Sequence, residues 1–461
     1  MTQTTAFDAL PLRQELLQSL ADLDYQAMTA VQAQSLPALI EGRDVIARAS
    51  TGSGKTVAFG LGILQHLEPE SFRIQSLILC PTRELAEQVA GALRTLAKGI
   101  GNVKVLTLCG GVSIGPQIGS LKHSAHIIVG TPGRVLKHLT KKTVRFKGLQ
   151  SLVLDEADRM LDMGFADEID EILSHLPRKR QSLLFSATYT DTITSMSDRV
   201  LQQPVVIDVT EKEPKPQVDQ LWLRTERSAR SGDLLRALSR WGGALNLVFC
   251  NTKIDCAELY DYLSDKGVSC VALHGDLEQA DRSKALIRFA NHSATVMIAT
   301  DVAARGLDIK ALDAVFNYEL PNQPEVYTHR IGRTGRAGSE GVAISLVANR
   351  EQQRLSAIEA EHPDLTPYEA AEPLEKLVVN QALNATMATV EVNGGRKHKL
   401  RAGDLLGALT ATGALPGTAV GKIDLQDTSS YVAVEHDHAK LAVKLLNQKI
   451  KGRTFRARLL R

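Results

Sequence analysis

Two stretches of the sequence decide its fold, Val45-Ile-Ala-Arg-Ala-Ser-Thr-Gly-Ser-Gly-Lys-Thr56 and Leu152-Val-Leu-Asp-Glu-Ala-Asp158. Each begins with strand-forming apolar residues and ends in a polar cluster. In the first, glycines let backbone N–H groups surround phosphate oxygens, and the helix that follows offers its positive N-terminus. This pattern predicts a phosphate-binding loop in which Lys55 reaches the β and γ phosphates and Thr56 holds Mg²⁺. The residues expected to line the phosphates are Ser50, Thr51, Gly52, Ser53 and Gly54.

The second stretch places a carboxylate pair after an apolar strand. An Asp-Glu pair at a strand end is, on its own, more often a solvated helix N-cap. Together with Lys55 in the same sheet it predicts a nucleotide-hydrolysing site, in which Asp155 holds Mg²⁺ and Glu156 polarises the attacking water. ATP and Mg²⁺ are therefore the expected cofactors.

Further strand-like runs flank these two, and each ends in a polar or Gly-rich cluster. Strands alternating with helices are typical of a parallel α/β sheet, in which ligands bind beyond the carboxyl ends of the strands. The charged, proline-containing segment 210–217 and the segment 363–383 interrupt the rhythm and are predicted to be linkers. The predicted domains are 1–209 and 218–362, both α/β with parallel sheets, and 384–461, a small α+β domain of βαββαβ order.

Charge separates the last domain from the rest. Residues 388–461 contain thirteen Lys/Arg and six Asp/Glu, a net charge of +7, so the remainder carries −5 within a total of +2. Basic residues gather at Arg396, Lys397, Lys399 and Arg401 and again over 449–458. A basic module on a slightly acidic body suggests a polyanionic partner, although a solvated charged face is the alternative.

Composition excludes several classes of protein. The 461 residues are 44% hydrophobic and 23% charged, the balance of a folded globular chain. No apolar run approaches the ~18–20 residues that span a bilayer, and the N-terminal residues lack a secretory pattern. Five scattered cysteines suit a reducing compartment better than a disulfide framework or a zinc site. We therefore expect a cytoplasmic protein without a membrane partner, and a monomer.

The ordered motifs Ala49–Thr56, Pro81-Thr-Arg-Glu-Leu85, Gly110-Gly111, Thr131-Pro-Gly-Arg134, Asp155-Glu-Ala-Asp158, Ser186-Ala-Thr188, Thr300-Asp301, Ala304–Asp308 and His329–Arg336 resemble those of DEAD-box RNA helicases. The resemblance implies two RecA-like domains over residues 7 to about 350 and an RNA-stimulated ATPase that locally unwinds short duplexes. It implies that Phe7, Thr29 and Gln32 read adenine, although Met28 and Ala30 replace prolines of the family pattern. It also implies that Asp308 touches the ribose.

The same resemblance assigns the remaining motif residues. Arg333 and Arg336 act as arginine fingers, which stabilise charge on the transferring phosphoryl group. Asp158, Ser186, Thr188 and His329 couple ATP hydrolysis to RNA binding. The implied RNA contacts, to backbone rather than bases, are Pro81, Thr82, Arg83, Gly110, Gly111, Thr131, Gly133, Arg134 and Thr300.

The last domain resembles an RNA-recognition-motif domain whose aromatic platform is missing. Thr389 stands where an aromatic residue would stack on a base, and only Tyr431 remains of the second strand motif. With Val392-Asn-Gly-Gly-Arg-Lys-His-Lys399, this tail resembles the bacterial DbpA/YxiN subfamily. That likeness implies binding to a hairpin in the peptidyl-transferase region of 23S rRNA and action on pre-50S ribosomal particles. Arg396, Lys397, Lys399 and Arg401 would then bind a structured RNA through its backbone.

Two other functions compete with this interpretation. A DNA-acting helicase could use the same two-domain core, and a general RNA clamp or remodeller with another structured target could use the same tail. The motif residues of the ATPase argue against a non-catalytic clamp, and the Pro-Thr-Arg-Glu-Leu and Ser-Ala-Thr motifs favour RNA over DNA.

Overall fold

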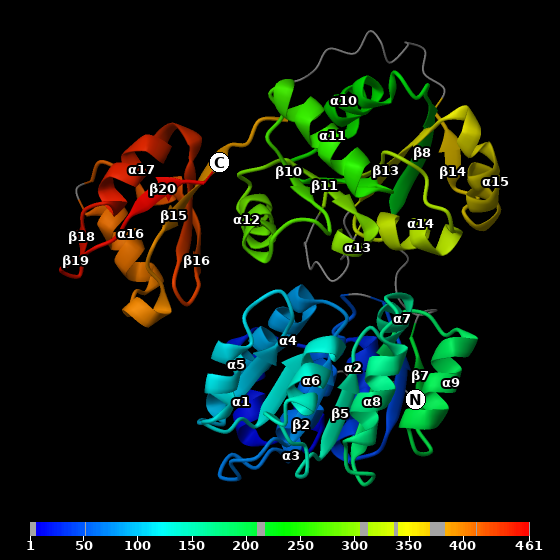
Figure 1. Cartoon of the computed structure of the whole chain (residues 1–461), viewed down its shortest axis with the longest axis vertical. Helices are drawn as coiled ribbons and strands as arrows, with labels where there is room; N and C mark the ends of the chain where they lie inside the picture. Colours follow the sequence, from blue (N-terminus) through cyan, green and yellow to red (C-terminus); the bar gives the residue numbers. More distant parts are fainter. Residues whose placement is uncertain are drawn as a thin grey trace. The chain divides into compact units, whose positions relative to one another are not determined.

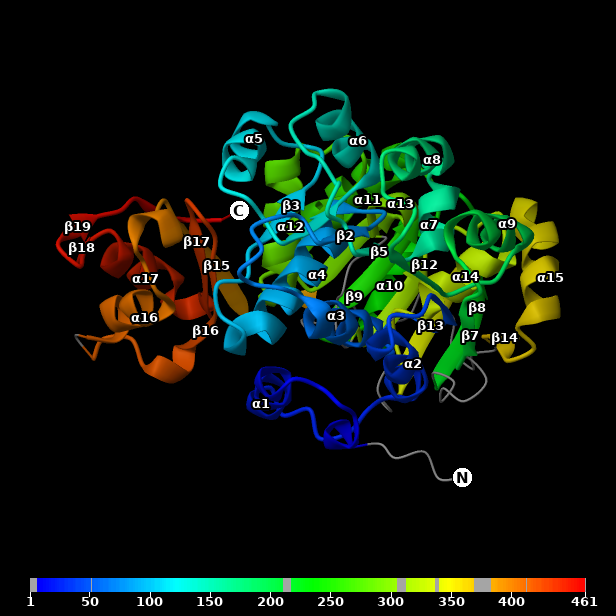
Figure 2. The same ribbon diagram turned by 90° about the horizontal axis from the view of Figure 1, so that it is seen from below.

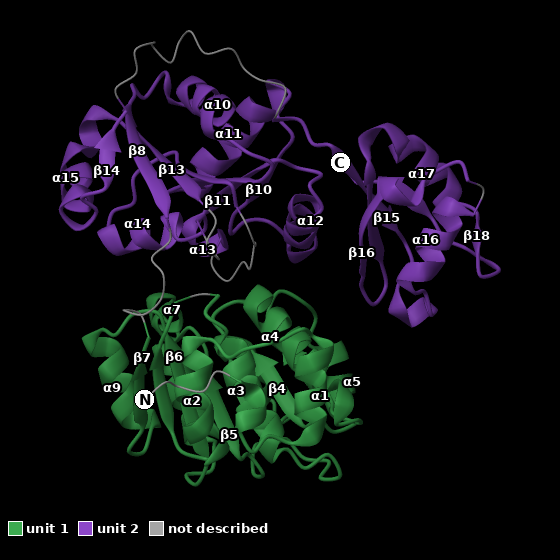
Figure 3. Ribbon diagram, turned by 180° about the vertical axis from the view of Figure 1, so that it is seen from behind, with its two compact units in different colours: residues 1–214, 306–308 green, residues 215–305, 309–461 purple. Residues whose placement is uncertain are grey.

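The computed structural model describes residues 6–50, 52–209, 217–304, 312–335, 340–368, 383–411 and 413–460. The chain divides into two compact units, residues 1–214 with 306–308 and residues 215–305 with 309–461 (Figure 3). Each unit is described separately below. Among the described residues, no helix has both the length and the apolar character needed to cross a membrane.

The first unit contains a seven-stranded parallel sheet with helices on both faces (Figure 1). The strand order is β3-β4-β2-β5-β6-β1-β7, and the central strands β2, β4, β5 and β6 are buried throughout. Continuous burial explains why these strands are apolar at successive positions instead of alternating. The strands are β1 (Val45–Arg48), β2 (Ser76–Leu79), β3 (Val105–Leu108), β4 (Ile127–Gly130), β5 (Ser151–Leu154), β6 (Gln181–Ser186) and β7 (Val205–Asp208).

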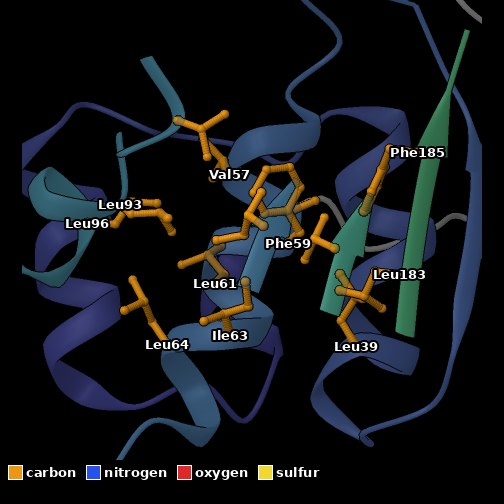
Figure 4. Packing of buried hydrophobic residues seen from close by; sticks show 14 of the residues in the cluster. Leu39, Val57, Phe59, Leu61, Ile63, Leu64, Leu93, Leu96, Leu183 and Phe185 are labelled. Carbon is orange, nitrogen blue, oxygen red and sulfur yellow. The ribbon is translucent and has the colours of Figure 1, made fainter. Parts of the chain in front are cut away.

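The helices of the first unit are η1 (Phe7–Ala9), α1 (Gln14–Asp22), α2 (Ala30–Ile40), α3 (Lys55–His66), α4 (Arg83–Leu96), η2 (Ala97–Gly99), α5 (Gly115–Leu121), α6 (Pro132–Thr140), α7 (Ala157–Asp162), α8 (Ala166–Ser174) and α9 (Asp191–Val200). Helix α3 is the most deeply enclosed of the helices that serve the site. Figure 4 shows its apolar side chains between α2, α4 and the sheet, with Phe59 against Phe185 of β6 at a ring-centroid distance of 5.4 Å. This packing fixes the N-terminus of α3 at the carboxyl end of β1.

The second unit repeats the design with a second seven-stranded parallel sheet, in the order β10-β11-β9-β12-β13-β8-β14. Its strands are β8 (Val218–Arg224), β9 (Asn246–Cys250), β10 (Cys270–Leu273), β11 (Val296–Thr300), β12 (Ala314–Asn317), β13 (Gly341–Val347) and β14 (Leu365–Pro367). Its helices are α10 (Arg230–Trp241), α11 (Lys253–Asp265), α12 (Gln279–Ala290), α13 (Asp301–Ala304), α14 (Pro324–Ile331), η3 (Asn349–Glu351) and α15 (Gln352–Glu361).

A small antiparallel sheet, in the order β16-β17-β15-β20, follows in the same unit. Figure 2 shows α16 and α17 on one face of it, where their leucines form a core with Val390, Val432 and Val434. The elements are β15 (Met387–Val392), η6 (Arg396–His398), α16 (Ala402–Thr410), η7 (Gly417–Ala419), β16 (Val420–Leu425), β17 (Ser430–Glu435), η8 (His436–His438), α17 (Ala439–Leu446), β18 (Lys449–Ile450), β19 (Arg453–Thr454) and β20 (Ala457–Leu459).

The predicted fold class, two parallel α/β sheets followed by a small α+β domain, is confirmed. Two details differ. Strand β14 lies inside the segment 363–383 that was predicted to be a linker, because Leu365 is buried and the strand pairs with the edge of β8. The last strand of the predicted βαββαβ order, β20, has only three residues, and an additional β18–β19 hairpin precedes it. Of the predicted linkers 210–217 and 363–383, residues 210–216 and 369–382 lie outside the described residues.

Candidate functional site

The loop between β1 and α3 has the conformation that an anion site requires. Gly52 and Gly54 adopt positive φ values of 91° and 97°, which residues with a side chain rarely take. Lys55 is the first residue of α3 and is buried, and its Nζ donates a hydrogen bond to the Ala49 carbonyl at 3.2 Å. The ammonium is therefore held within the turn of the loop, at a helix N-terminus that favours phosphate. Thr51 lies outside the described residues.

Helix α2 supports this loop through Gln32. The Gln32 amide accepts from the Thr29 N–H at 2.9 Å and donates to the Gly54 carbonyl at 3.1 Å. A Cβ at Gly54 would lie 2.5 Å from Gln32 Nε2, so glycine is also required by this close approach. Thr29 and Gln32 thus meet beside the phosphate loop, while Phe7 is buried in the core of the same unit. Their contact with adenine stays a prediction.

Two carboxylates stand at the carboxyl end of β5. Asp155 Oδ1 and Glu156 Oε2 are buried and have no hydrogen-bond partner among the described residues. Burial raises the pKa of Asp155 to about 7, with Glu156 adding to the rise and Lys55 opposing it. Glu156 also adopts a left-handed backbone conformation (φ 52°, ψ 54°), which costs roughly 1–3 kcal/mol. Buried, unsatisfied oxygens and a strained backbone are typical of a site that is completed by a ligand.

These donors fit Mg²⁺ bound together with a nucleotide. Mg²⁺ commonly takes one or two carboxylates and completes its shell with phosphate oxygens and water. The described residues contain no cluster of three or more His, Cys, Asp or Glu that could hold a metal without such help. Thr56, which follows Lys55 in α3, supplies a hydroxyl at the same edge of the sheet.

Asp158 joins β5 to β6. Its Oδ2 accepts from the Ala187 N–H at 3.2 Å, from the Thr188 N–H at 3.1 Å and from the Thr188 hydroxyl at 3.1 Å. Its Oδ1 accepts from the Arg159 N–H, and the Ser186 hydroxyl donates to the Thr188 carbonyl at 2.7 Å. The expected grouping of Asp158 with Ser186 and Thr188 is present.

The loops predicted to contact RNA follow β2, β3 and β4, three neighbouring strands. Pro81 and Thr82 are buried, and Thr82 caps α4 by accepting from the Leu85 N–H at 3.3 Å. One buried guanidinium nitrogen of Arg83, Nη1, has no hydrogen-bond partner in the described part of the chain. Gly110, Gly111, Thr131 and Gly133 complete this edge and are half-buried or exposed.

Arg134 is engaged within this edge by a residue that the sequence did not single out. Its guanidinium donates to Gln117 Oε1 at 2.9 Å and to the Val112 carbonyl at 2.7 Å. Gln117 also donates to the Cys109 carbonyl at 3.0 Å, and its Oε1 lies 3.0 Å from His138 Nε2. Gln117 therefore fixes the loop after β3 to α6, and no sequence pattern marks it.

In the second unit, the motif around His329 is anchored by Arg330. This fully buried guanidinium makes two 2.7 Å hydrogen bonds to the Asp301 carboxylate and one of 2.8 Å to Asn251 Oδ1. Thr300 ends β11 beside Asp301, and Arg333 is buried close to the end of α14. Asp308 and Arg336 lie outside the described residues. The prediction overlooked Arg330, although it belongs to the quoted motif.

The tail brings its two basic clusters together. Lys451 pairs with Asp404 at 2.8 Å, and Arg453 Nη1 lies 3.5 Å from the His398 carbonyl. Arg396, Lys397, Lys399 and Arg401 are exposed on the turn 393–401, so this turn and the β18–β19 hairpin form one basic surface. We call residues 393–401 and 449–454 the basic surface of the tail.

Gly394 and Gly395 hold the turn of this surface against the domain. A Cβ on Gly394 would lie 2.4 Å from the Phe455 ring, and one on Gly395 would lie 2.2 Å from the Gln426 carbonyl oxygen. Any side chain at either position would push the turn away. The two glycines of the quoted tail motif therefore have a packing role.

Among the described residues of the small sheet, none provides an exposed aromatic platform on its open face. Tyr431 is buried, and its hydroxyl lies 3.4 Å from Glu391 Oε1. Glu391 is in turn paired with Arg458 at 2.6 Å. Thr389 is also buried, with its hydroxyl 2.7 Å from Ser293 Oγ. Both positions at which an aromatic platform would stand are thus buried.

Comparison with known proteins identifies the family. The family model "DEAD/DEAH box helicase" matches residues 29–196, "Helicase conserved C-terminal domain" matches 230–338, and "DbpA RNA binding domain" matches 389–459. The chain is 49% identical to the ATP-dependent RNA helicase DbpA of Escherichia coli, with both chains covered completely. The chain belongs to the DEAD-box RNA helicases.

Two further DEAD-box proteins match about four fifths of the chain. The chain is 41% identical to the helicase CshA of Bacillus subtilis over 77% of its own length and 72% of the relative's. It resembles the solved structure of Saccharomyces cerevisiae Dbp5 bound to RNA and ADP BeF3, with a TM-score of 0.71 and 32% identity over 79% of this chain and 95% of that one. This DEAD-box protein is thus an ATP-dependent RNA helicase with an RNA-binding C-terminal domain. The match removes the basis for the DNA-acting alternative.

Proposed function

We propose that this DEAD-box helicase hydrolyses ATP with the groups gathered at the carboxyl edge of the first sheet. Lys55 binds the β and γ phosphates, Thr56 and Asp155 hold Mg²⁺, and Glu156 polarises the attacking water. When bound, Mg²⁺ neutralises charge that develops on the phosphates. Asp155 Oδ1 and Glu156 Oε2 support these roles, because both are buried and accept no hydrogen bond from the described residues, so a cation and a water molecule would satisfy them. Glu156 Oε2 is also 4.0 Å from Arg159 Nε, an ion pair too long to be a hydrogen bond.

Arg333 and Arg336 stabilise the transferring phosphoryl group from the second unit. Because Lys55 and Glu156 belong to the first unit (Figure 3), hydrolysis requires the two units to close on one ATP molecule. RNA binds the loops that follow β2, β3, β4 and β11 through its backbone. Asp158, Ser186, Thr188 and His329 transmit the closure between ATP and RNA.

The tail directs this activity to a structured RNA, a hairpin in the peptidyl-transferase region of 23S rRNA within pre-50S particles. The observation that carries the proposal is the joining of residues 393–401 and 449–454 into one basic surface, next to a sheet face without exposed aromatic rings. Such a surface grips a folded backbone and does not read splayed-out bases. Action on ribosomal particles in a bacterium implies a cytoplasmic location.

The test compares RNA-stimulated ATPase activity with 23S rRNA and with a non-ribosomal RNA of equal length. A chain truncated after residue 380 should keep its maximal rate but require much more RNA, and should lose its preference for 23S rRNA. The triple variant Arg396→Glu, Lys397→Glu and Lys399→Glu should behave similarly. The matched control, Lys422→Glu, Lys440→Glu and Lys444→Glu, reverses three exposed charges elsewhere in the same domain. Retention of the full preference by the truncated chain would place specificity in the core.

A further inference from the structure

The charge of the first unit is strongly segregated along the sequence. Between Glu87 and Asp155, residues 88–154 contain ten Lys/Arg and no Asp/Glu, in a chain whose net charge is only +2. Arg134 serves the RNA edge described above. Most of the other cations in this stretch have no role in that site.

Several of these cations gather at the edge of the sheet opposite the ATP and RNA motifs. In a parallel sheet all connections that enter the strands lie at the amino edge, and those that leave them lie at the carboxyl edge. The segment that enters β2 supplies Arg73, the one that enters β4 supplies Lys122, and the one that enters β5 (residues 141–150) supplies four more. We call Arg73, Lys122, Lys141, Lys142, Arg145 and Lys147, all exposed, the amino-edge patch.

The patch surrounds a hollow that contains an aromatic ring. The hollow has a volume of about 460 Å³, and its lining includes Phe72, Arg73, Arg145 and Lys147. Phe72 is 59% exposed, which is unusual for phenylalanine, and one side of its ring packs on His126 at a centroid distance of 5.7 Å. Three cations therefore flank an open aromatic ring that the core does not require.

A positively charged groove with an aromatic ring is the arrangement that binds single-stranded nucleic acid, because phosphates contact the cations and a base stacks on the ring. Two acidic residues, Glu68 and Glu70, lie in the same segment as Phe72. Glu68 pairs with Arg73 at 3.5 Å in an exposed ion pair, which a phosphate can replace at little cost. An acidic peptide would satisfy the charges but would leave the ring without a partner.

We propose that the amino-edge patch is a second binding site for single-stranded RNA, in which a base stacks on Phe72 while Arg145 and Lys147 contact the flanking phosphates. The site lies outside the helicase motifs. It holds RNA that extends beyond the segment gripped at the carboxyl edge, and so it favours long substrates over short ones. The proposal rests on the helicase activity of the chain and is independent of its ribosomal target.

The test uses the full chain and fluorescently labelled oligouridylate of two lengths. The short RNA has about 10 nucleotides, which one groove accommodates, and the long RNA is several times longer. The variant Arg145→Glu/Lys147→Glu should bind the long RNA about tenfold more weakly. Loss of two phosphate contacts should lower the slope of log affinity against log salt by about 1.4. Affinity for the short RNA, and ATPase turnover at saturating short RNA, should stay within twofold of wild type.

Two further variants make the result specific. Phe72→Ala should weaken binding of the long RNA about fivefold without changing the salt slope, because the ring carries no charge. Arg240→Glu/Lys266→Glu, which reverses two exposed charges in the second unit, should leave both RNAs unaffected. Thermal melting should match wild type, since all substituted side chains are exposed.

The proposal is overturned if Arg145→Glu/Lys147→Glu binds the long RNA as the control variant does, or if both RNA lengths are affected equally. Polyglutamate serves as a second probe, which stands for an acidic protein partner. The proposal is also overturned if Arg145→Glu/Lys147→Glu binds polyglutamate more weakly than wild type does but binds the long RNA equally well.

Discussion

The connection from Asp158 to the Ser186–Thr188 loop can be tested by removing its acceptor. In Asp158→Ala, the N–H groups of Ala187 and Thr188 lose the carboxylate that accepts from both. Thr188 N–H has a second acceptor, Ser186 Oγ at 3.3 Å, so the cost concentrates on Ala187. Hydrogen bonds to a charged acceptor contribute about 1.5–3 kcal/mol each, so we expect the loop to lose about 3 kcal/mol of local stability.

A loss of that size raises the equilibrium constant for opening of the loop roughly 100-fold, since 1.36 kcal/mol is a factor of ten. Hydrogen exchange of the Ala187 and Thr188 amides in the full chain should accelerate accordingly. Asp158→Asn, which keeps one acceptor oxygen, should give an intermediate value. Duplex unwinding should fall at least tenfold while ATP still binds.

The matched control is Asp162→Ala, because Asp162 is exposed on the same helix, α7. If the amides of Ala187 and Thr188 exchange in Asp158→Ala at rates within threefold of those in this control, the carboxylate does not hold the loop. The proposed coupling between β5 and β6 would then be wrong.

Three other predictions concern the two sites and the packing around them. Glu156→Gln should lower the turnover of phosphate release by about 10²–10⁴ while ATP and RNA affinities stay within a few-fold, and a turnover within fivefold of wild type would contradict its role. Burial, aided by nearby Arg134, lowers the pKa of His138 from 6.5 to about 4, so its stabilising contribution is complete above pH 6.5 and is lost as the pH falls toward 4. Over that pH range, the free energy of unfolding of wild type should fall by up to about 3 kcal/mol more than that of His138→Gln. Equal pH dependence of thermal melting in the two proteins would contradict this. Gly395→Ala should displace the basic turn, because its Cβ meets the Gln426 carbonyl, and should raise the RNA concentration needed for half-maximal ATPase without changing the maximal rate.

The fold could be predicted from the sequence where strands are buried on both faces, whereas the interior strand β8, which is only partly buried, was missed. Strands β1, β2, β4, β5 and β6 have apolar runs because both of their faces are covered. The strands that were not predicted include β3, β7 and β14, which lie at sheet edges. Strand β14 has three residues and ends in Pro367, so it gives no clear apolar signal. Strand β7 contains the apolar run Val205-Val-Ile207 and was missed in spite of it.

The candidate site was predictable where chemistry and spacing coincide, as at Lys55 and Asp155, and Asp158 was found through the family resemblance. The residues that hold the motifs in position were not. Gln117 and Arg330 act through partners that are distant in sequence, and a single polar residue in a helix carries no periodic signal for such contacts. The net charge of residues 1–387, −5, also gave no indication of the amino-edge patch, because it averages over residues 88–154, which contain no Asp or Glu.

The strand order β5-β6-β1 sets the separation between the two halves of the ATP site. With one strand between them, β1, which leads into the Lys55 loop, and β5, which leads into the carboxylates, lie about 9.6 Å apart across the sheet, twice the usual strand spacing. The two charges still act on each other, because Lys55 opposes the burial-driven rise in the pKa of Asp155. Adjacent strands would halve the spacing and strengthen that attraction, which a ligand would then have to overcome. The wider spacing suits a molecule long enough to offer anionic oxygens to one side and a bound cation to the other.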